Sequence, residues 1–423
     1  MKETFSVKET PPRAFLVGIR DENSAKTEAE SLAGELLSLA DTLGLEIAGR
    51  ETVHIRKNSL QYGMGSGKAG ELSEKALSLG AECLVFDREI SPSQQRNWEK
   101  LSGLAVIDRQ ELILQIFAGR ARTREAVLQV RLAELYYSLP RLRHKYIDLN
   151  RQRGGRYGTT GSGEARLETD RRLVEQRILR LEGELEAVRR QRELQRKHRR
   201  RQGARICALV GYTNAGKSRL FNALTGADFP VEDKLFATLD SASRALTLPG
   251  GAQVILSDTV GFIRRLPHSL VSAFRSTLEE ASLADLLIHV LDASDEAAEK
   301  YYKTTMAVLR DLGADAIPMI TVLNKADKSE AQEALEGLLK NYPGAIPVSA
   351  AGGSGLGELL AKMEALLSDK ARRFRFPLTR PDLAALTHRN GSVLSESYEE
   401  DYIEVEARID EKTTGQLKEY LAD

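Results

Sequence analysis

Residues 211–218, GYTNAGKS, have the types and spacing of a phosphate-binding loop. The run follows the apolar stretch ICALV and precedes the helix-like stretch RLFNAL, which is the strand–loop–helix setting that such a loop requires. Its glycines would let backbone N–H groups approach phosphate oxygens, and a helix N-terminus favours anions. We expect Lys217 to reach the β- and γ-phosphates and the Ser218 hydroxyl to ligate Mg²⁺.

Three further motifs follow strand-like runs and indicate which nucleotide is bound. In SDTVGF, Asp258 can hold Mg²⁺ through water and the Gly261 N–H can meet the γ-phosphate. In NKAD, Asp327 can accept hydrogen bonds from guanine N1–H and the 2-amino group, a donor pair that adenine lacks. A backbone N–H at Ser349-Ala350 would meet the guanine O6. Because ligands of such sheets bind at the carboxyl ends of strands, the set predicts GTP.

A loop containing FATLD (236–240) lies between the first two motifs and would order with GTP and relax after hydrolysis. Thr238 is its best candidate to touch Mg²⁺ and the γ-phosphate. We assign the catalytic roles to Lys217, Thr238 and Gly261. We assign the Mg²⁺ to Ser218, Thr238 and Asp258. The residues expected to contact the nucleotide are Gly211, Tyr212, Thr213, Asn214, Ala215, Gly216, Lys217, Ser218, Phe236, Ala237, Thr238, Asp258, Thr259, Val260, Gly261, Asn324, Lys325, Asp327, Ser349 and Ala350.

The chain divides into four segments by pattern. Residues 1–118 alternate strand-like and helix-like stretches and predict a small open α/β sheet. In residues 119–201, leucines and other apolar residues recur at intervals of four and three. This spacing predicts two antiparallel coiled-coil helices around a Gly/Arg-rich tip, with Pro140 kinking or ending the first helix. Residues 202–369 form a second, mostly parallel α/β unit with helices on both faces, and 370–423 a small α+β unit that ends in a helix over 413–421.

Composition excludes several classes of protein. Of 423 residues, 42% are hydrophobic and 29% charged, which fits folded cores and excludes a wholly disordered chain. No apolar run is long enough to span a membrane, and the N-terminus lacks a signal-peptide core. Two cysteines, Cys83 and Cys207, cannot form a disulfide framework, so we expect a cytoplasmic protein.

A formal net charge of zero hides a segregation of charge. Residues 119–205 hold 24 Lys/Arg against 11 Asp/Glu, a net charge of +13, and the remainder has a net charge of −13. Such a segment suits a polyanionic partner, although a solvated charged helix pair would show the same composition. The basic run 189–205 could equally be a solvated connector.

Two features compete with this interpretation. GMGSGKA (63–69) looks like a second phosphate loop, but Ala69 replaces the hydroxyl ligand and Tyr62 stands at the first glycine position. We interpret it as a glycine turn entering a helix, and a second nucleotide or RNA-phosphate contact stays open. His289, inside an apolar strand, is expected to be a satisfied buried group and not a base.

Together the motifs GYTNAGKS, FATLD, DTVGFI, NKAD and SA resemble the HflX family of ribosome-associated GTPases, as does GGRYGTTGSGEARLETDRR (154–172), and the resemblance spans nearly the whole chain. It implies a P-loop GTPase that hydrolyses GTP to GDP and phosphate, binds the large ribosomal subunit and splits or rescues ribosomes under stress. The arm's charge fits contact with rRNA phosphates. The arginines expected to touch RNA are Arg151, Arg153, Arg156, Arg166, Arg171 and Arg172.

The resemblance also bears on mechanism. Phe262 stands where many GTPases carry a Gln that orients the attacking water, so intrinsic hydrolysis should be weak unless another group or a partner positions that water. Asn214 matches a potassium-binding Asn of some related GTPases, and K⁺ would neutralise transition-state charge. We expect a monomer. The alternatives are a GTP-dependent switch or scaffold that docks a protein partner through the hairpin without remodelling ribosomes, and a regulator peripheral to the membrane.

Overall fold

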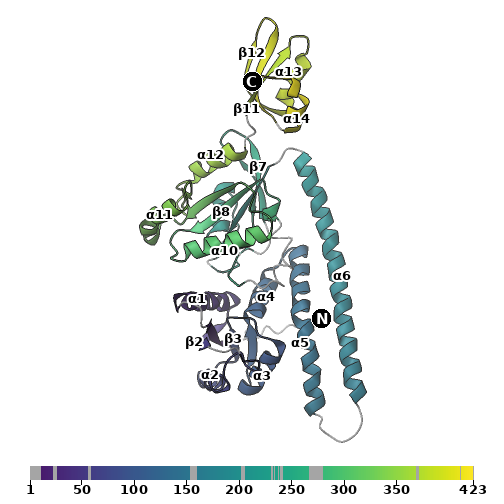
Figure 1. The fold of residues 1–423 in the computed structure, drawn as a ribbon, viewed down its shortest axis with the longest axis vertical. Helices are drawn as coiled ribbons and strands as arrows, with labels where there is room; N and C mark the ends of the chain where they lie inside the picture. Colours follow the sequence, from purple (N-terminus) through teal and green to yellow (C-terminus); the bar gives the residue numbers. More distant parts are fainter. Residues whose placement is uncertain are drawn as a thin grey trace, which may run out of the picture.

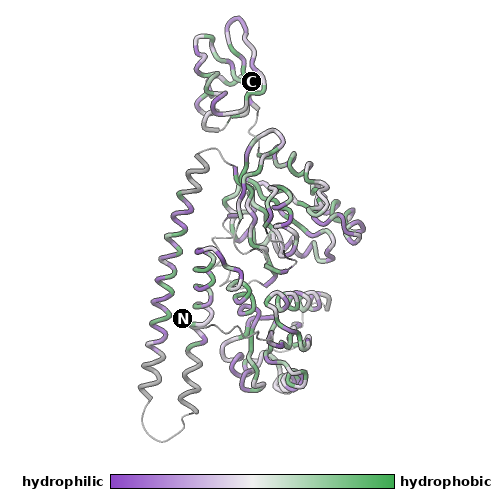
Figure 2. Tube along the Cα trace, turned by 180° about the vertical axis from the view of Figure 1, so that it is seen from behind, coloured by the Kyte–Doolittle hydropathy of each residue, from purple (hydrophilic) through white to green (hydrophobic). Residues whose placement is uncertain are grey.

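The structure, a computed structural model, describes residues 11–21, 26–55, 59–152, 160–201, 205–229, 232, 234–236, 238, 242–265, 280–367, 371–409 and 411–422. Two α/β units lie one above the other, a long helical hairpin runs beside both, and a small unit sits at the far end of the second (Figure 1). Within these described ranges no helix has the length and apolar character needed to cross a membrane. Hydrophobic residues gather in the strands of the α/β units (Figure 2).

The first unit is a four-stranded parallel sheet in the order β2-β1-β3-β4, as the alternating pattern predicts. Its strands are β1 (Arg13–Asp21), β2 (Glu46–Ile55), β3 (Cys83–Phe86) and β4 (Ala105–Asp108), and its helices are α1 (Lys26–Leu43), α2 (Ser66–Ser78), α3 (Pro92–Ser102) and α4 (Arg109–Arg120). Helices α1 and α4 share one core cluster, whereas α2 and α3 pack in another. Lys68, in the first turn of α2, pairs with Glu51 and with Glu71, each at 2.9 Å, so its charge is balanced by carboxylates of the same unit.

The arm consists of α5 (Arg124–Gln152) and α6 (Thr160–Arg201). The predicted seam is confirmed, because the leucines spaced by four and three on α5 are packed against their counterparts on α6. Its buried members are Leu128, Leu132, Ile178, Leu181 and Leu185. Of the two expected effects of Pro140, an end to the first helix is wrong, since α5 continues through it, and a kink stays a prediction. The described seam residues of α5 lie before the proline and extend to Leu139, and the helix stays formed although one backbone hydrogen bond is lost.

The second α/β unit has a six-stranded sheet in the order β10-β9-β8-β5-β7-β6, parallel except for β6. Its strands are β5 (Arg205–Gly211), β6 (Ala242–Thr247), β7 (Gln253–Asp258), β8 (Leu286–Asp292), β9 (Met319–Asn324) and β10 (Ile346–Pro347), and its helices include α7 (Lys217–Thr225), α10 (Ala298–Asp311), α11 (Ser329–Asn341) and α12 (Leu356–Leu367). Strands β5, β8 and β9 are almost wholly buried, as expected for strands covered on both faces. All the motif loops therefore open at one edge of this sheet.

The last unit is an antiparallel sheet, β12-β13-β11-β14, covered by α13. Its elements are β11 (Ala371–Pro377), α13 (Pro381–Asn390), β12 (Gly391–Tyr398), β13 (Tyr402–Ile409), α14 (Glu411–Gln416), a 3₁₀ turn (Lys418–Tyr420) and β14 (Leu421–Ala422). The single helix predicted over 413–421 is wrong. Helix α14 ends at Gln416 because Leu421 and Ala422 pair with β11. This pairing satisfies backbone N–H and C=O groups that a longer helix would have bonded internally.

The two α/β units share a hydrophobic core, which the sequence did not predict. Ile116 and Phe117 of α4 belong to the same buried cluster as Tyr212, Phe236 and Ile263 from the nucleotide-binding motifs. The Phe117 and Phe236 rings meet edge to face at 4.7 Å. This shared burial fixes the first unit against the loops of the second.

We expect Leu181→Ala to lower the hydrogen-exchange protection of the α5 and α6 amides by about 2 kcal/mol or more, because it opens a cavity in the seam. Leu181 is 8% exposed, whereas Leu179 on the same helix is 68% exposed. Leu179→Ala, the matched control, should leave protection unchanged. Equal effects of the two substitutions would show that the seam does not stabilise the arm.

Candidate nucleotide-binding site

The phosphate loop joins β5 to α7, and its shape depends on glycine. Gly216 adopts φ 88° as the residue before α7. A Cβ there would lie 2.3 Å from Asn324 Nδ2, so a side chain would push the guanine-side motif away as well as strain the backbone. Glycine at this position lets the loop close tightly over the start of α7. It leaves the helix N-terminus open to an anion.

Lys217 is buried in the site, and its Nζ donates to the carbonyls of Gly211 and Tyr212 at 3.2 and 2.8 Å. Burial lowers the pKa of Lys217 to about 8, against the opposing effect of the Asp258 carboxylate. A phosphate group would restore the missing negative charge around this ammonium. The position of Lys217 therefore fits the phosphate contact expected of it.

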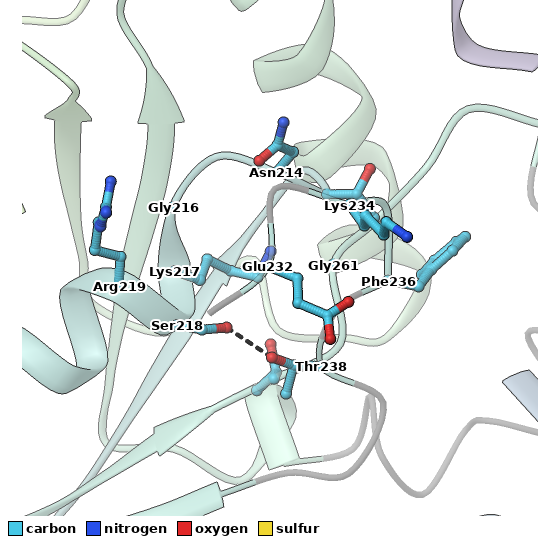
Figure 3. Close-up of a pocket in the computed structure, with 12 residues that line it drawn as sticks. Asn214, Gly216, Lys217, Ser218, Arg219, Glu232, Lys234, Phe236, Thr238 and Gly261 are labelled. Carbon is cyan, nitrogen blue, oxygen red and sulfur yellow. Dashed lines mark hydrogen bonds between the residues drawn. The ribbon is translucent and has the colours of Figure 1, made fainter. Parts of the chain in front are cut away.

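The three oxygen ligands predicted for Mg²⁺ come together. Ser218 Oγ lies 2.6 Å from Thr238 Oγ1 (Figure 3). It also donates to Asp258 Oδ2 at 2.6 Å. Burial raises the pKa of Asp258, opposed by the charge of Lys217 and the hydroxyls. Its second oxygen, Oδ1, is buried and has no hydrogen-bond partner among the described residues. Hard oxygen donors with an orphaned carboxylate oxygen fit a magnesium ion.

The guanine-side motifs also meet at the carboxyl ends of β9 and β10. Asn324 joins them, because its Nδ2 donates to the Ala215 carbonyl at 2.9 Å and its Oδ1 accepts from the Ala350 N–H at 3.1 Å. Lys325 Nζ donates to the Asn214 carbonyl at 2.9 Å. A hydrogen bond from Ser349 keeps the pKa of Asp327 low, so its carboxylate is ionised and can accept two donors.

Phe262 does not face the phosphates. It is 1% exposed and packs with Val210, Ala281 and Leu287 behind the sheet. Its backbone pairs with the phosphate loop instead: Thr213 N–H donates to the Phe262 carbonyl at 2.8 Å, and Phe262 N–H donates to the Gly211 carbonyl at 3.0 Å. The side chain at the usual water-orienting position is thus part of the core.

Gly261 lies in close contact with the phosphate loop. A Cβ on it would lie 2.7 Å from Thr213 Cα and 2.9 Å from Lys217 Nζ. Any larger residue would displace the lysine or the loop. The backbone at Gly261 is therefore held against the phosphate loop and Lys217, and the contact of its N–H with a γ-phosphate oxygen stays a prediction.

Several residues predicted to contact the nucleotide turn their side chains elsewhere. The backbone of Phe236 has φ 55°, and its ring points away from the pocket toward the first α/β unit (Figure 3). Val260 lies in the buried cluster that the two α/β units share. Thr259 Oγ1 donates to the Leu209 carbonyl at 2.6 Å. Tyr212 stacks on Tyr301 with ring centroids 3.9 Å apart. Only their backbones remain available to a nucleotide. Ala237 lies outside the described residues.

Sequence reasoning missed the charged residues that join the pocket. Glu232, Lys234 and Arg219 line it with the predicted residues (Figure 3). Glu232 pairs with Arg120, the last residue of α4. On α1, Glu35 is buried beside the apolar face of the helix and contacts Tyr212. The sequence signal for Glu35 was an acidic residue placed beside the leucines on the apolar face of α1, where a buried partner is needed.

The remaining predicted residues have these positions. His289 is fully buried, but the expectation that it is satisfied is wrong, since neither ring nitrogen has a hydrogen-bond partner among the described residues. Burial lowers its pKa to about 3, so it stays neutral. Of the arm arginines, Arg171 pairs with Glu175 at 2.7 Å and Arg172 is exposed. Arg153 and Arg156 lie outside the described residues, and the side chains of Arg151 and Arg166 are not described.

We expect the affinity for GDP to fall as pH rises above about 8, by up to about tenfold per pH unit. Lys217 has a pKa of about 8 before binding. A bound phosphate raises that pKa, so binding above it requires uptake of a proton, whereas below it Lys217 is already charged. Calorimetry between about pH 7 and 9 measures the affinity and the proton uptake.

Lys217→Arg is the control, because a guanidinium stays charged throughout. The titration of GDP itself is common to both proteins. A native protein with the same pH dependence as Lys217→Arg would contradict the assignment of this proton to Lys217.

Comparisons with known proteins agree with this geometry. Three family models match: "GTP-binding GTPase N-terminal" over residues 30–118, "GTP-binding GTPase Middle Region" over 120–199, and "50S ribosome-binding GTPase" over 206–325. The GTPase HflX of Akkermansia muciniphila is 46% identical over 99% of this chain and 100% of that protein. The GTPase HflX of Escherichia coli is 40% identical over 87% of each chain.

Among solved structures, a GTP-binding protein from the archaeon Sulfolobus solfataricus in complex with GDP is 25% identical over 84% of this chain and 98% of that one, with a TM-score of 0.43. The nearly full-length identity to bacterial relatives, the three matching regions and the assembled phosphate and guanine motifs lead to one conclusion. The chain belongs to the HflX family of GTPases and is a GTP hydrolase.

Proposed function

We propose that this GTPase binds the large ribosomal subunit through its basic arm and couples GTP binding and hydrolysis to ribosome splitting or rescue under stress, acting in the cytoplasm. The observation that carries the proposal is one chain holding both an assembled phosphate site and a hairpin segment of net charge +13. Family membership supports it, because the matching G-domain family is described as ribosome-binding. A surface of that charge suits rRNA, whose phosphates dominate affinity.

In the proposed reaction, Lys217 and the backbone at Gly261 bind the γ-phosphate and stabilise the charge that develops on it. Ser218, Thr238 and Asp258 would hold Mg²⁺, which supplies positive charge to the phosphate oxygens. Asp327 selects guanine. Because the Phe262 side chain is buried in the core, it cannot orient water, so the ribosome is proposed to supply the missing stimulation.

We propose four functional domains, at residues 1–118, 119–201, 202–369 and 370–423. The sheets and the hairpin support this division. The contacts between the first and third domains make these two a single packed body.

Binding to the ribosome is tested by co-sedimentation with isolated large subunits across a salt series. We expect a non-hydrolysable GTP analogue to promote association more than GDP. Neutralising Arg151, Arg153 and Arg156 to Ala should reduce the slope of log affinity against log salt by about one for each rRNA phosphate that the arm no longer binds. The control removes three exposed charges from α10 and α11, at Lys303, Arg310 and Lys340.

Two outcomes would contradict the proposal. If neither GTP nor its analogue promotes association at any salt, the chain does not use nucleotide to bind ribosomes, and the scaffold alternative is favoured. If the control variant loses as much affinity as the arm variant, the ribosome is not bound by the arm tip.

We also propose that Asn214 holds K⁺, which would supplement the positive charge around the phosphates. Its backbone adopts φ 61°, and it lines the pocket. Turnover in K⁺ should exceed turnover in Na⁺ at equal ionic strength, and Asn214→Ala should remove the difference. Equal rates in the two salts would reject this role.

A further inference from the structure

The hydroxyl of Tyr212 joins three parts of the molecule. Tyr212 is the second residue of the phosphate loop, and its hydroxyl donates to Glu35 on α1. The same oxygen accepts a hydrogen bond from the Arg264 backbone N–H at 2.8 Å. Since Arg264 comes three residues after Gly261, this one oxygen connects the phosphate loop, the loop that carries the γ-phosphate contact and the N-terminal domain.

Glu35 is itself held by buried charges of the N-terminal domain. Its carboxylate contacts the guanidinium of Arg109 at the start of α4, and Arg109 also donates to Asp87 at 2.5 Å. The side chains of all three are at most 5% exposed. Charges this deeply buried are tolerated only when paired, so removing one partner leaves another uncompensated. The network is therefore a rigid support for the Tyr212 hydroxyl.

The same network holds Arg264 at several atoms. Arg109 Nη2 donates to the Arg264 carbonyl at 3.0 Å, and the Arg264 guanidinium donates to Glu35 at 3.1 Å and to Ser31 at 3.0 Å. Burial lowers the pKa of Arg264, but Glu35 and Tyr212 together more than compensate and the net pKa is raised. The backbone N–H, the carbonyl and the side chain of Arg264 are thus all fixed.

The place of this contact in the fold is informative. Asp87 directly follows β3, and Arg109 directly follows β4, so both stand at the carboxyl edge of the N-terminal parallel sheet. That edge is where sheets of this kind bind their ligands. Here it receives Arg264 and Arg265, the latter donating to the Asp87 carbonyl at 3.3 Å. The ligand-binding edge of the N-terminal sheet is thus occupied by the loop that follows Gly261.

We propose that Glu35 and Arg109 are positioning residues of the GTPase reaction, acting through the Tyr212 hydroxyl and the Arg264 backbone. They hold the phosphate loop and the Gly261 loop in the mutual arrangement that hydrolysis requires. The chain depends on this support because no side chain at position 262 helps, and the Gly261 backbone must be placed accurately. This role rests on GTP hydrolysis alone and is independent of ribosome binding.

The test compares intrinsic single-turnover GTP hydrolysis with GDP affinity for Tyr212→Phe, Glu35→Gln and the double variant. Tyr212→Phe removes one oxygen and keeps the ring that stacks on Tyr301, so folding is preserved. We expect each single variant to lose about tenfold in hydrolysis rate, with GDP affinity within about twofold of native. The double variant should be no slower than either single one, because both break the same contact.

Tyr136→Phe is the matched control. It removes a tyrosine–carboxylate hydrogen bond of the same kind, from Tyr136 to Glu182 at 2.5 Å, between the two helices of the arm. Its hydrolysis rate should be native. An unchanged or faster rate for Tyr212→Phe would overturn the proposal, as would rate losses that multiply in the double variant. A parallel loss of GDP affinity would show a general structural defect and would overturn it too.

Discussion

The nucleotide site depends on one backbone pairing. The phosphate loop at the end of β5 and the loop at the end of β7 exchange hydrogen bonds between Gly211, Thr213 and Phe262. This extends the parallel register of the two strands past their ends. The extension brings the Gly261 backbone against Lys217, so a lysine charge and a backbone segment lie side by side at the phosphate loop. Phosphate chemistry needs that arrangement more than any single side chain.

This constraint explains why Phe262 is compatible with the site. A residue whose backbone forms such a pairing directs its side chain into the core behind the sheet, and an apolar ring stabilises that core. A polar side chain there would be buried without a partner. The pairing is thus stabilised at the position where other GTPases place a water-orienting Gln. Phe262 therefore stabilises the loop after β7, and its side chain cannot orient the attacking water.

Local chemistry made most of the architecture predictable from sequence. The motif loops follow apolar strands, and parallel strands bring their carboxyl ends to one edge, so Ser218, Thr238 and Asp258 could be expected to meet. The arm was visible in its leucine spacing. The last helix failed because its end pairs with β11, a contact between distant residues that local pattern cannot show. Contacts between domains were unpredictable for the same reason: nothing local marks Glu35 as the partner of Tyr212, since the two lie 177 residues apart.

The packing of the arm gives this arrangement a mechanical consequence. Asp108 and Arg109 are adjacent, and Asp108 accepts a hydrogen bond from Arg141 of α5 at 3.0 Å. A displacement of α5 would therefore reach Arg109 through the half-buried Arg141 and the buried Asp108. Because Arg109 also holds the Arg264 carbonyl, the route from the arm to the loop at Gly261 crosses only a few side chains. A polyanion that bound the basic arm and displaced α5 would therefore change the geometry around Gly261 without touching the nucleotide.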